Sequence, residues 1–225
     1  MASRLLRQNS LSIVFLLLFL AALVGQAFAG WHQFNAQQVS EQLGTISFGD
    51  YLTSASFAVD VAENWQSEYL QFLLYIVGTI WLIQIGSPES PSAPGLGTEE
   101  DHKIGEYAEP DSPKWAKVGG FRTLLFSWSL SLTMLAIFLA SWTIQSVAGW
   151  AAFNETQLQS RMDTISWGSY LVNADFWART LQNWQSEFLA VGSMAILAVY
   201  LRQRGSAESK PVGEPHDSTG ATDGE

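Results

Sequence analysis

The pentapeptide Asn64-Trp65-Gln66-Ser67-Glu68 occurs twice in this chain, because the same five residues return as Asn183-Trp184-Gln185-Ser186-Glu187. The two copies lie 119 positions apart, and the same offset relates matching residues on both sides of them. For example, Gly30-Trp31 matches Gly149-Trp150, and Glu89-Ser90 matches Glu208-Ser209. A constant offset over this length indicates a tandem duplication, in which one structural unit is used twice.

The composition of the chain is typical of a membrane protein. Of its 225 residues, 48% are hydrophobic and only 14% are charged, whereas a soluble domain carries about a quarter charged residues. Its ten tryptophans gather at the ends of apolar runs, where an amphipathic indole lies at a membrane interface. The absence of cysteine excludes disulfides and thiolate nucleophiles. The formal net charge of −10 argues against nucleic acid as a partner.

Four segments are expected to cross the membrane as helices. They cover about 11–29, 66–85, 124–148 and 185–201. The first is apolar for 19 residues, enough to cross about 30 Å of hydrocarbon. It also resembles a cleavable signal peptide, but its partner in the second repeat is internal, so we expect residues 1–29 to be retained. The fourth has only 14 apolar residues and requires local thinning of the bilayer or snorkelling of Arg202 and Arg204.

Two segments of about 35 residues, 30–64 and 149–183, are expected to lie outside the membrane. Within the first of them, residues 47–52 are predicted to form a short capped helical turn. Ser54 and Asn173 occupy equivalent positions, and both residue types are common helix N-caps. They predict two long helices, over about 55–85 and 174–203.

Composition also suggests how the chain is divided. The segment after the second span is rich in Ser, Pro and Gly and contains Glu99-Glu100-Asp101, and such a segment buries too little apolar surface to become ordered. The predicted parts are a first repeat (1–86), an acidic flexible linker (87–118), a second repeat (119–205) and a disordered acidic tail (206–225).

Basic residues that flank the spans predict the orientation. Seven of them lie on one side, namely Arg4, Arg7, Lys114, Lys117, Arg122, Arg202 and Arg204. Only Arg161 and Arg179 lie on the other. Both termini and the 87–118 linker are therefore expected in the cytoplasm, with a multi-pass chain in the cell (inner) membrane. Each repeat is then a helical hairpin, and the two copies share one topology, as in parallel repeats.

The duplicated motif also supplies a candidate polar site. A helical wheel places the side chains of Asn64, Ser67, Glu68 and Gln71 within about one third of the circumference. The second copy contributes Asn183, Ser186 and Glu187. In a functional interpretation, Glu68 and Glu187 face each other and bind a cation or share a proton. In a structural interpretation, which we favour, these groups are hydrogen-bonded contacts between helices.

The remaining groups of residues give little indication of a ligand, metal or catalytic site. Four tryptophans in repeated positions, Trp31, Trp65, Trp150 and Trp184, are interpreted as interfacial anchors, with an aromatic ligand cage as the alternative. The three histidines are scattered, so we expect no metal site. No His matches the serines beside the glutamates, so a hydrolase triad is not supported. We expect no catalytic residue and no cofactor.

Three sequence elements together resemble a known family. They are the Asn-Trp-Gln-Ser-Glu-aromatic-Leu motifs, the Ser-aromatic-Gly-x-Tyr-Leu turns at 47–52 and 166–171, and the stretch 202–211. The resemblance is to a family of bacterial integral membrane proteins that is internally duplicated and of unknown function. It implies a bacterial cytoplasmic membrane, but no activity, substrate or catalytic residue.

These observations predict an all-α membrane protein with four transmembrane helices, arranged as two tandem parallel-repeat hairpins. The expected function is that of a non-enzymatic structural or interaction protein of the bacterial cell envelope. The alternative is a small transporter or channel that uses the duplicated polar stripe of the second and fourth spans. The expected partners are the lipid bilayer and either a second copy of the chain or another membrane protein.

Overall fold

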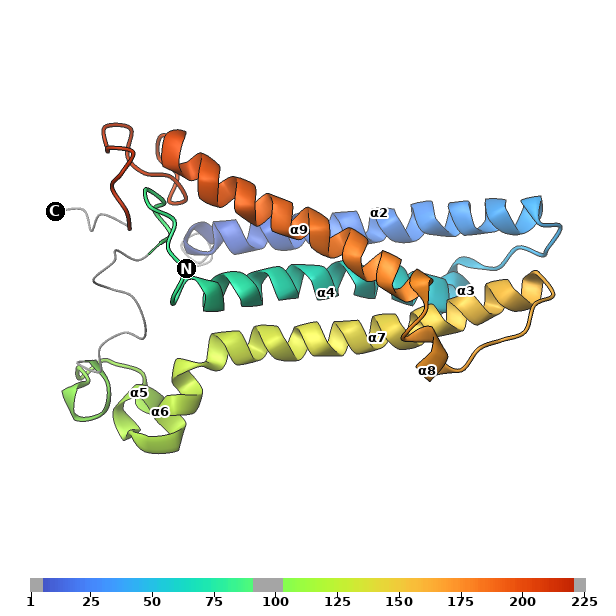
Figure 1. Cartoon of the computed structure of the whole chain (residues 1–225), viewed down its shortest axis with the longest axis horizontal. Coiled ribbons are helices and arrows are strands. Elements are labelled where there is room, and N and C mark those ends of the chain that lie inside the picture. Colours follow the sequence, from blue (N-terminus) through green and yellow to red (C-terminus); the bar gives the residue numbers. More distant parts are fainter. Residues whose placement is uncertain (1–5, 91–102, 221–225) are drawn as a thin grey trace. The chain divides into compact units, whose positions relative to one another are not determined.

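The computed structural model describes residues 6–90 and 103–220, and this part of the chain contains helices and turns but no strand (Figure 1). Arg4 and the acidic cluster Glu99-Glu100-Asp101 lie outside the described residues. The helices are α2 (Ser10–Ser40), α3 (Phe48–Leu52), α4 (Ala55–Gly78), η3 (Gly105–Tyr107), α5 (Lys114–Val118), α6 (Gly120–Ser127), α7 (Ser129–Gln159), α8 (Trp167–Tyr170) and α9 (Ala174–Tyr200). The protein is therefore all-helical, as predicted.

Two of these helices, α2 and α7, are long and apolar enough to cross a membrane, with 31 residues each. Helix α2 contains the first predicted span (11–29). Helix α7 contains residues 129–148 of the third predicted span (124–148), and residues 124–127 lie in α6. Helices α4 and α9 do not meet the same test of length and composition, because charged and polar residues occupy their N-terminal halves. Helix α4 also ends at Gly78 rather than near residue 85, and the chain then tightens into a turn closed by the bond from Leu82 N to Gly78 O.

Contacts group the chain into two compact units. The first contains Met1–Val61 and Val147–Ile165, and the second contains Ala62–Ser146 and Ser166–Glu225. The predicted repeat boundaries divide the chain by sequence and remain a prediction.

In the first unit, two loops close with the same hydrogen bonds. The indole N–H of Trp31 donates to the carbonyl of Ile46 at 2.9 Å, and the Asn35 side chain bonds both the carbonyl and the N–H of Ile46. At the equivalent positions, the indole of Trp150 donates to Ile165 O at 2.7 Å, and Asn154 bonds both backbone groups of Ile165. Each loop begins with a non-glycine residue at positive φ, Gln42 at 61° and Arg161 at 58°.

The short helix α3 packs on α2 within this unit (Figure 1). Ser47 and Asp50 form a capping box at its start, which confirms the predicted capped turn. The ring of Phe48 stacks on Phe28 with centroids 4.5 Å apart. Tyr51 is buried against Phe34 and against the backbone at Gly30.

The predicted N-caps of the two long helices are also confirmed. The Ser54 hydroxyl accepts a hydrogen bond from Phe57 N at 3.2 Å, and the Asn173 side chain accepts one from Asp175 N at 2.9 Å. Each bond satisfies a backbone N–H that has no partner within the helix.

Replacing Gly30 with alanine is expected to destabilise the protein by about 1 kcal/mol, since overpacking a tight contact costs more than the helix propensity gained. A Cβ at Gly30 would lie 2.2 Å from the Tyr51 hydroxyl oxygen, and buried Tyr51 has little room to move. Gly25→Ala in the same helix is the matched control, because no atom lies within 4 Å of its Cβ position. Chemical unfolding in detergent would measure both variants, and equal stability would contradict this account.

In the second unit, aromatic rings join α9 to the neighbouring part of α7. Trp142 of α7 lies 6.1 Å from Phe176, 6.4 Å from Trp177 and 5.9 Å from Trp184, measured between ring centroids. Such contacts add to the free energy gained by burying apolar area. This aromatic cluster holds the N-terminal half of α9 against α7.

The C-terminal segment forms turns over its described residues, 206–220. The disordered acidic tail expected over 206–225 stays a prediction. The turns surround buried Lys210, whose ammonium group donates to the carbonyls of Pro215, His216 and Ser218 at 2.9–3.1 Å. These three bonds replace the hydration of the charge and fold the segment around it. A composition rich in Gly, Pro and charged residues does not reveal such a contact.

Candidate functional site

The first copy of the duplicated motif lies on α4 within the second unit. Its central residues, Gln66 and Ser67, are 0% and 2% exposed. Its outer residues Asn64, Trp65 and Glu68 are exposed. Gln66 belongs to the motif but is not among the predicted site residues. It is the most deeply buried of the five motif residues.

Gln66 connects the two copies of the motif. Its side-chain oxygen accepts a hydrogen bond of 2.8 Å from the indole N–H of Trp184, and its amide donates to the carbonyl of Glu63 at 3.1 Å. The equivalent glutamine in the second copy, Gln185, is exposed. The two identical motifs therefore contact each other through different residues.

An ion-pair cluster lies one turn before this contact. The Arg179 guanidinium of α9 is 3.3 Å from the carboxylate of Glu63 on α4 and 3.3 Å from Asp175 on its own helix. The hydroxyl of Tyr170, which is fully buried, donates to Asp175 at 2.8 Å. These contacts tie α4 to α9 and α9 to α8.

The electrostatics of this cluster follow from its charges. Burial raises the pKa of the Tyr170 hydroxyl, and its hydrogen bond to Asp175 and the negative charge of Asp175 raise it further. Burial alone would lower the pKa of Arg179, but the carboxylates of Asp175 and Glu63 raise it by more. Tyr170 therefore stays neutral and Arg179 stays charged at physiological pH.

Sequence reasoning treated Arg179 only as a flanking charge. One feature of the sequence does indicate a special role for Arg179. Its equivalent in the first repeat is Asp60, and this reversal of charge indicates that the two positions have different surroundings. The spacing of four residues between Asp175 and Arg179 is also that of a helical ion pair.

A third polar contact joins α7 to α9. The Gln145 amide donates to the Thr180 hydroxyl at 3.2 Å, and both side chains are at most 1% exposed. Among the described residues, the Gln145 side-chain oxygen and the Trp142 indole nitrogen are buried without a hydrogen-bond partner. This is a polar contact within an otherwise aromatic interface.

The structure brings together three of the predicted site residues. The Ser67 hydroxyl lies 3.5 Å from the Glu187 carboxylate, and Glu68 and Glu187 are close enough for their charges to repel. The same hydroxyl lies 2.9 Å from the Asn64 carbonyl, which is the better acceptor at this distance. Ser67 therefore contacts Glu187 only weakly.

The remaining predicted residues do not join this group. Asn183 donates to the carbonyl of Arg179 and Ser186 donates to that of Asn183, so both bond within α9. The side-chain oxygen of Gln71 is buried and has no hydrogen-bond partner among the described residues. The predicted polar site residues therefore lie in several different environments and do not form one site.

Three of the four predicted anchors use their indole N–H within the protein. Trp31 and Trp150 each donate to an isoleucine carbonyl, and Trp184 donates to Gln66. Trp65 is 42% exposed. An interfacial role for these residues stays a prediction.

The chain can now be compared with known proteins. A family model described as a domain of unknown function (DUF6766) matches residues 2–221, which is nearly the whole chain. The protein belongs to this family. No curated protein and no solved structure matches it.

Membership in DUF6766 agrees with the resemblance to a family of unknown function, and it assigns no activity to any residue. Within the described part of this DUF6766 protein, no three His, Asp or Glu side chains are grouped in a way that could hold a metal ion. The expected lack of a catalytic residue and a cofactor stays a prediction.

This DUF6766 protein also has a cavity of about 350 Å³ in its second unit, between the C-terminal halves of α4 and α9. Its walls are mostly apolar, with Leu74 and Phe188 on opposite sides and glycines at positions 78 and 192. Of the seven predicted site residues, only Gln71 lines it. The cavity is therefore separate from the Ser67–Glu187 contact.

Proposed function

We propose that this DUF6766 protein is an integral membrane protein with four spanning helices, and that it serves as a non-enzymatic structural or interaction protein of the bacterial cell envelope. The observation that carries the proposal is the exposed apolar surface of α2. Large apolar side chains that are 41–72% exposed occur along most of its first 19 residues, namely Leu11, Val14, Phe15, Leu16, Leu17, Leu18, Phe19, Leu20, Val24 and Phe28.

Such a surface is unfavourable in water, where soluble monomers rarely expose contiguous apolar patches of more than a few hundred Å². In a bilayer the same side chains are solvated by lipid tails. Helix α7 supports the proposal as well, because Leu130, Leu132, Leu135 and Leu139 are exposed along it.

The second and fourth spans are proposed for the C-terminal parts of α4 and α9. Their N-terminal parts carry the charged residues and would lie outside the hydrocarbon. The apolar part of α9, from about residue 188 to Tyr200, is shorter than the roughly 20 residues of a typical span, so local thinning of the bilayer is part of this proposal. Both termini and the 87–118 linker would then face the cytoplasm.

A structural role is supported by how the buried polar groups are used. Gln66 bonds Trp184, Arg179 bonds Glu63, and Gln145 bonds Thr180, in each case across a helix–helix contact. Polar pairs of this kind fix which helix faces pack together, because a buried polar group that loses its partner costs free energy. The partner would be a second copy or another membrane protein that covers part of the apolar surface.

Two measurements test the membrane proposal. The protein should stay with membranes in alkaline carbonate and dissolve only in detergent. Because the native chain has no cysteine, an introduced Gly44→Cys should react with an impermeant reagent in intact spheroplasts, whereas Glu109→Cys should react only after lysis. Release by carbonate would contradict membrane insertion, and the opposite labelling pattern would contradict the orientation.

The alternative function is a small transporter or channel. It is favoured by the repulsion between Glu68 and Glu187, since two close carboxylates can bind a cation. It is also favoured by Gln71, which lines the 350 Å³ cavity and has a buried side-chain oxygen without a hydrogen-bond partner among the described residues. Ion flux in proteoliposomes separates the two proposals. A structural protein gives no flux above empty vesicles, whereas flux that is lost in Glu187→Gln would replace the structural role with transport.

A further inference from the structure

Two short helices of the second unit, α5 and α6, precede the apolar helix α7. Gly119 and Gly120 between them have positive φ values of 74° and 63°, which glycine adopts without strain. The Thr123 hydroxyl of α6 donates to the carbonyl of Trp115 on α5 at 2.7 Å. This bond holds the two helices against each other at the N-terminal end of α7 (Figure 1).

Residues 114–128, here called the basic–aromatic segment, expose most of their large apolar side chains. Six of these side chains are 37–75% exposed, namely Trp115, Val118, Phe121, Leu124, Leu125 and Phe126. Phe121, Leu124 and Leu125 are spaced i, i+3 and i+4, so they lie on one side of α6. Exposed apolar side chains at this density indicate contact with another molecule or with a membrane.

The basic–aromatic segment is also positively charged, although the chain as a whole is acidic. It contains Lys114, Lys117 and Arg122 and no Asp or Glu, whereas the whole chain has a formal net charge of −10. Lys117 donates to the carbonyl of Pro110. The side chains of Lys114 and Arg122 are exposed, and neither forms an ion pair within the described part of the chain. These two cations are therefore available to an anionic partner.

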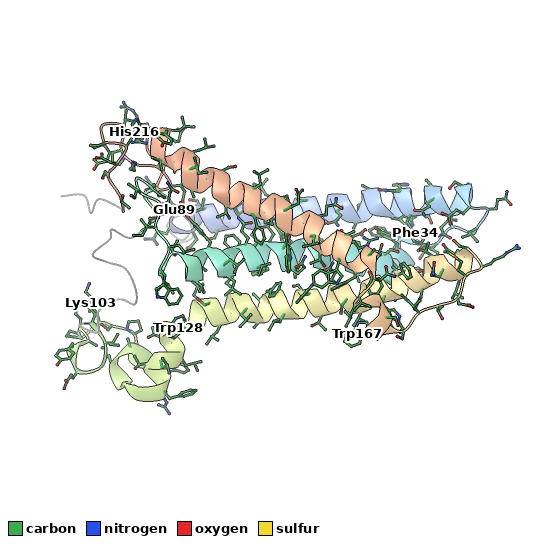
Figure 2. All side chains as sticks on the ribbon, in the orientation of Figure 1. Phe34, Glu89, Lys103, Trp128, Trp167 and His216 are labelled. Carbon is green, nitrogen blue, oxygen red and sulfur yellow. The ribbon has the colours of Figure 1, made fainter. Side chains whose placement is uncertain are left out.

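The segment ends where the proposed third span begins. Helix α7 starts at Ser129, directly after Trp128, and Figure 2 shows Trp128 at this junction. The 31 residues of α7 extend about 46 Å, which exceeds the roughly 30 Å of hydrocarbon. The span therefore does not need residues 124–127, and α6 can lie at the level of the lipid headgroups. Exposed Leu130 and Leu132 continue the apolar surface of the segment into α7.

A membrane that contains anionic lipids fits both properties of this surface. Segments that combine Lys and Arg with Trp, Phe and Leu bind in the plane of the interface, with their apolar side chains at the boundary of the acyl chains. Basic residues beside a span are attracted to the anionic lipids of the cytoplasmic leaflet. An acidic protein could neutralise the charges, but the apolar surface continues into α7, which the proposed function places in lipid.

We propose that the basic–aromatic segment is a binding site for anionic phospholipids at the cytoplasmic surface of the membrane. Its apolar side chains enter the headgroup region, and Lys114 and Arg122 donate charge-assisted hydrogen bonds to lipid phosphate groups. Lys117 adds positive charge while it bonds the Pro110 carbonyl. This inference rests on the membrane location proposed above and adds the class of lipid that the protein recognises.

Native mass spectrometry of the full-length protein in detergent counts the bound lipid molecules directly. The dissociation constant of the first phosphatidylglycerol should be at least about tenfold lower than that of phosphatidylcholine, which has no net charge, because two cations contribute. Lys114→Gln and Arg122→Gln should each raise the constant for phosphatidylglycerol about fivefold, the contribution of one basic residue near an anionic surface. The double variant should bind the two lipids equally.

Arg161→Gln is the matched control, because it removes an exposed positive charge outside the segment. Its equivalent in the first repeat is Gln42, with φ values of 58° for Arg161 and 61° for Gln42, so a glutamine fits this backbone. The control should bind phosphatidylglycerol like the native chain. Glycerol phosphate, which has the anionic phosphate but no acyl chains, should not compete with the lipid at the same concentration.

The proposal is overturned if the native chain binds both lipids equally, or if the double variant keeps the native affinity for phosphatidylglycerol. Competition by glycerol phosphate would overturn it as well, since the site would then bind phosphate and not lipid. Extraction with alkaline carbonate separates this inference from the proposed function. A protein that stays in the membrane but does not prefer phosphatidylglycerol refutes the lipid site alone, whereas release by carbonate refutes the membrane location on which the site depends.

Discussion

Replacing Gln66 with leucine is expected to lower the free energy of unfolding by about 2–3 kcal/mol. This value is in the upper part of the range for a buried hydrogen-bond donor that has lost its acceptor. Leucine has similar volume but cannot accept the 2.8 Å hydrogen bond from the Trp184 indole. Because Gln66 is 0% exposed, water cannot take its place. The carbonyl of Glu63 loses a donor at the same time.

The second repeat provides a matched control for this prediction. Gln185→Leu makes the same chemical change in the same pentapeptide, but at an exposed position. Its effect should stay within about 0.5 kcal/mol, as for most surface substitutions. Unfolding by a denaturing detergent, followed by tryptophan fluorescence, would compare the two variants. Equal effects would mean that the Gln66–Trp184 contact contributes nothing to stability.

Replacing Arg179 with alanine is expected to cost about 2 kcal/mol. Removing one partner of a fully buried ion pair costs 3–5 kcal/mol, because the other charge stays buried without compensation. The Arg179 side chain is 39% exposed, so water screens the remaining charges and reduces this value. The loss also leaves Glu63 and Asp175 without the cation that joins α4 to α9.

The same unfolding assay measures this variant, with Arg122→Ala as the control because Arg122 is exposed on α6. A double-mutant cycle with Glu63→Gln isolates the pair that crosses between helices. Coupling of at least about 0.5 kcal/mol is expected. If Arg179→Ala unfolds like the native protein and no coupling appears, then this ion pair does not hold α4 and α9 together.

Much of the local structure could be predicted from the residues themselves. The 119-residue offset predicted that equivalent positions would behave alike, and the loops at Trp31 and Trp150 do close with the same hydrogen bonds. The capped turn at Ser47 and the N-caps at Ser54 and Asn173 were also predictable. These features depend on partners within about 15 residues along the chain, so the local sequence already contains both partners.

The candidate site was predicted less well. A helical wheel shows which side chains share a face, but not which neighbouring helix covers that face. Gln66 and Gln185 have identical flanking residues, yet one is buried on Trp184 and the other is exposed. In the functional interpretation of the sequence, Glu68 and Glu187 bind a cation or share a proton, and this interpretation stays a prediction.

The sequence by itself determined the helical class, the duplicated loops and the positions of the caps, because each of these depends on short-range hydrogen bonding and on the period of apolar residues. The tertiary structure alone decided that Arg179 pairs with Glu63, that Trp184 bonds Gln66, and that Lys210 folds the C-terminal segment. Glu63 and Arg179 lie 116 positions apart, and Gln66 and Trp184 lie 118 apart. Contacts at such separations form only when packed helices bring distant segments together, and two identical motifs then acquire different neighbours and different roles.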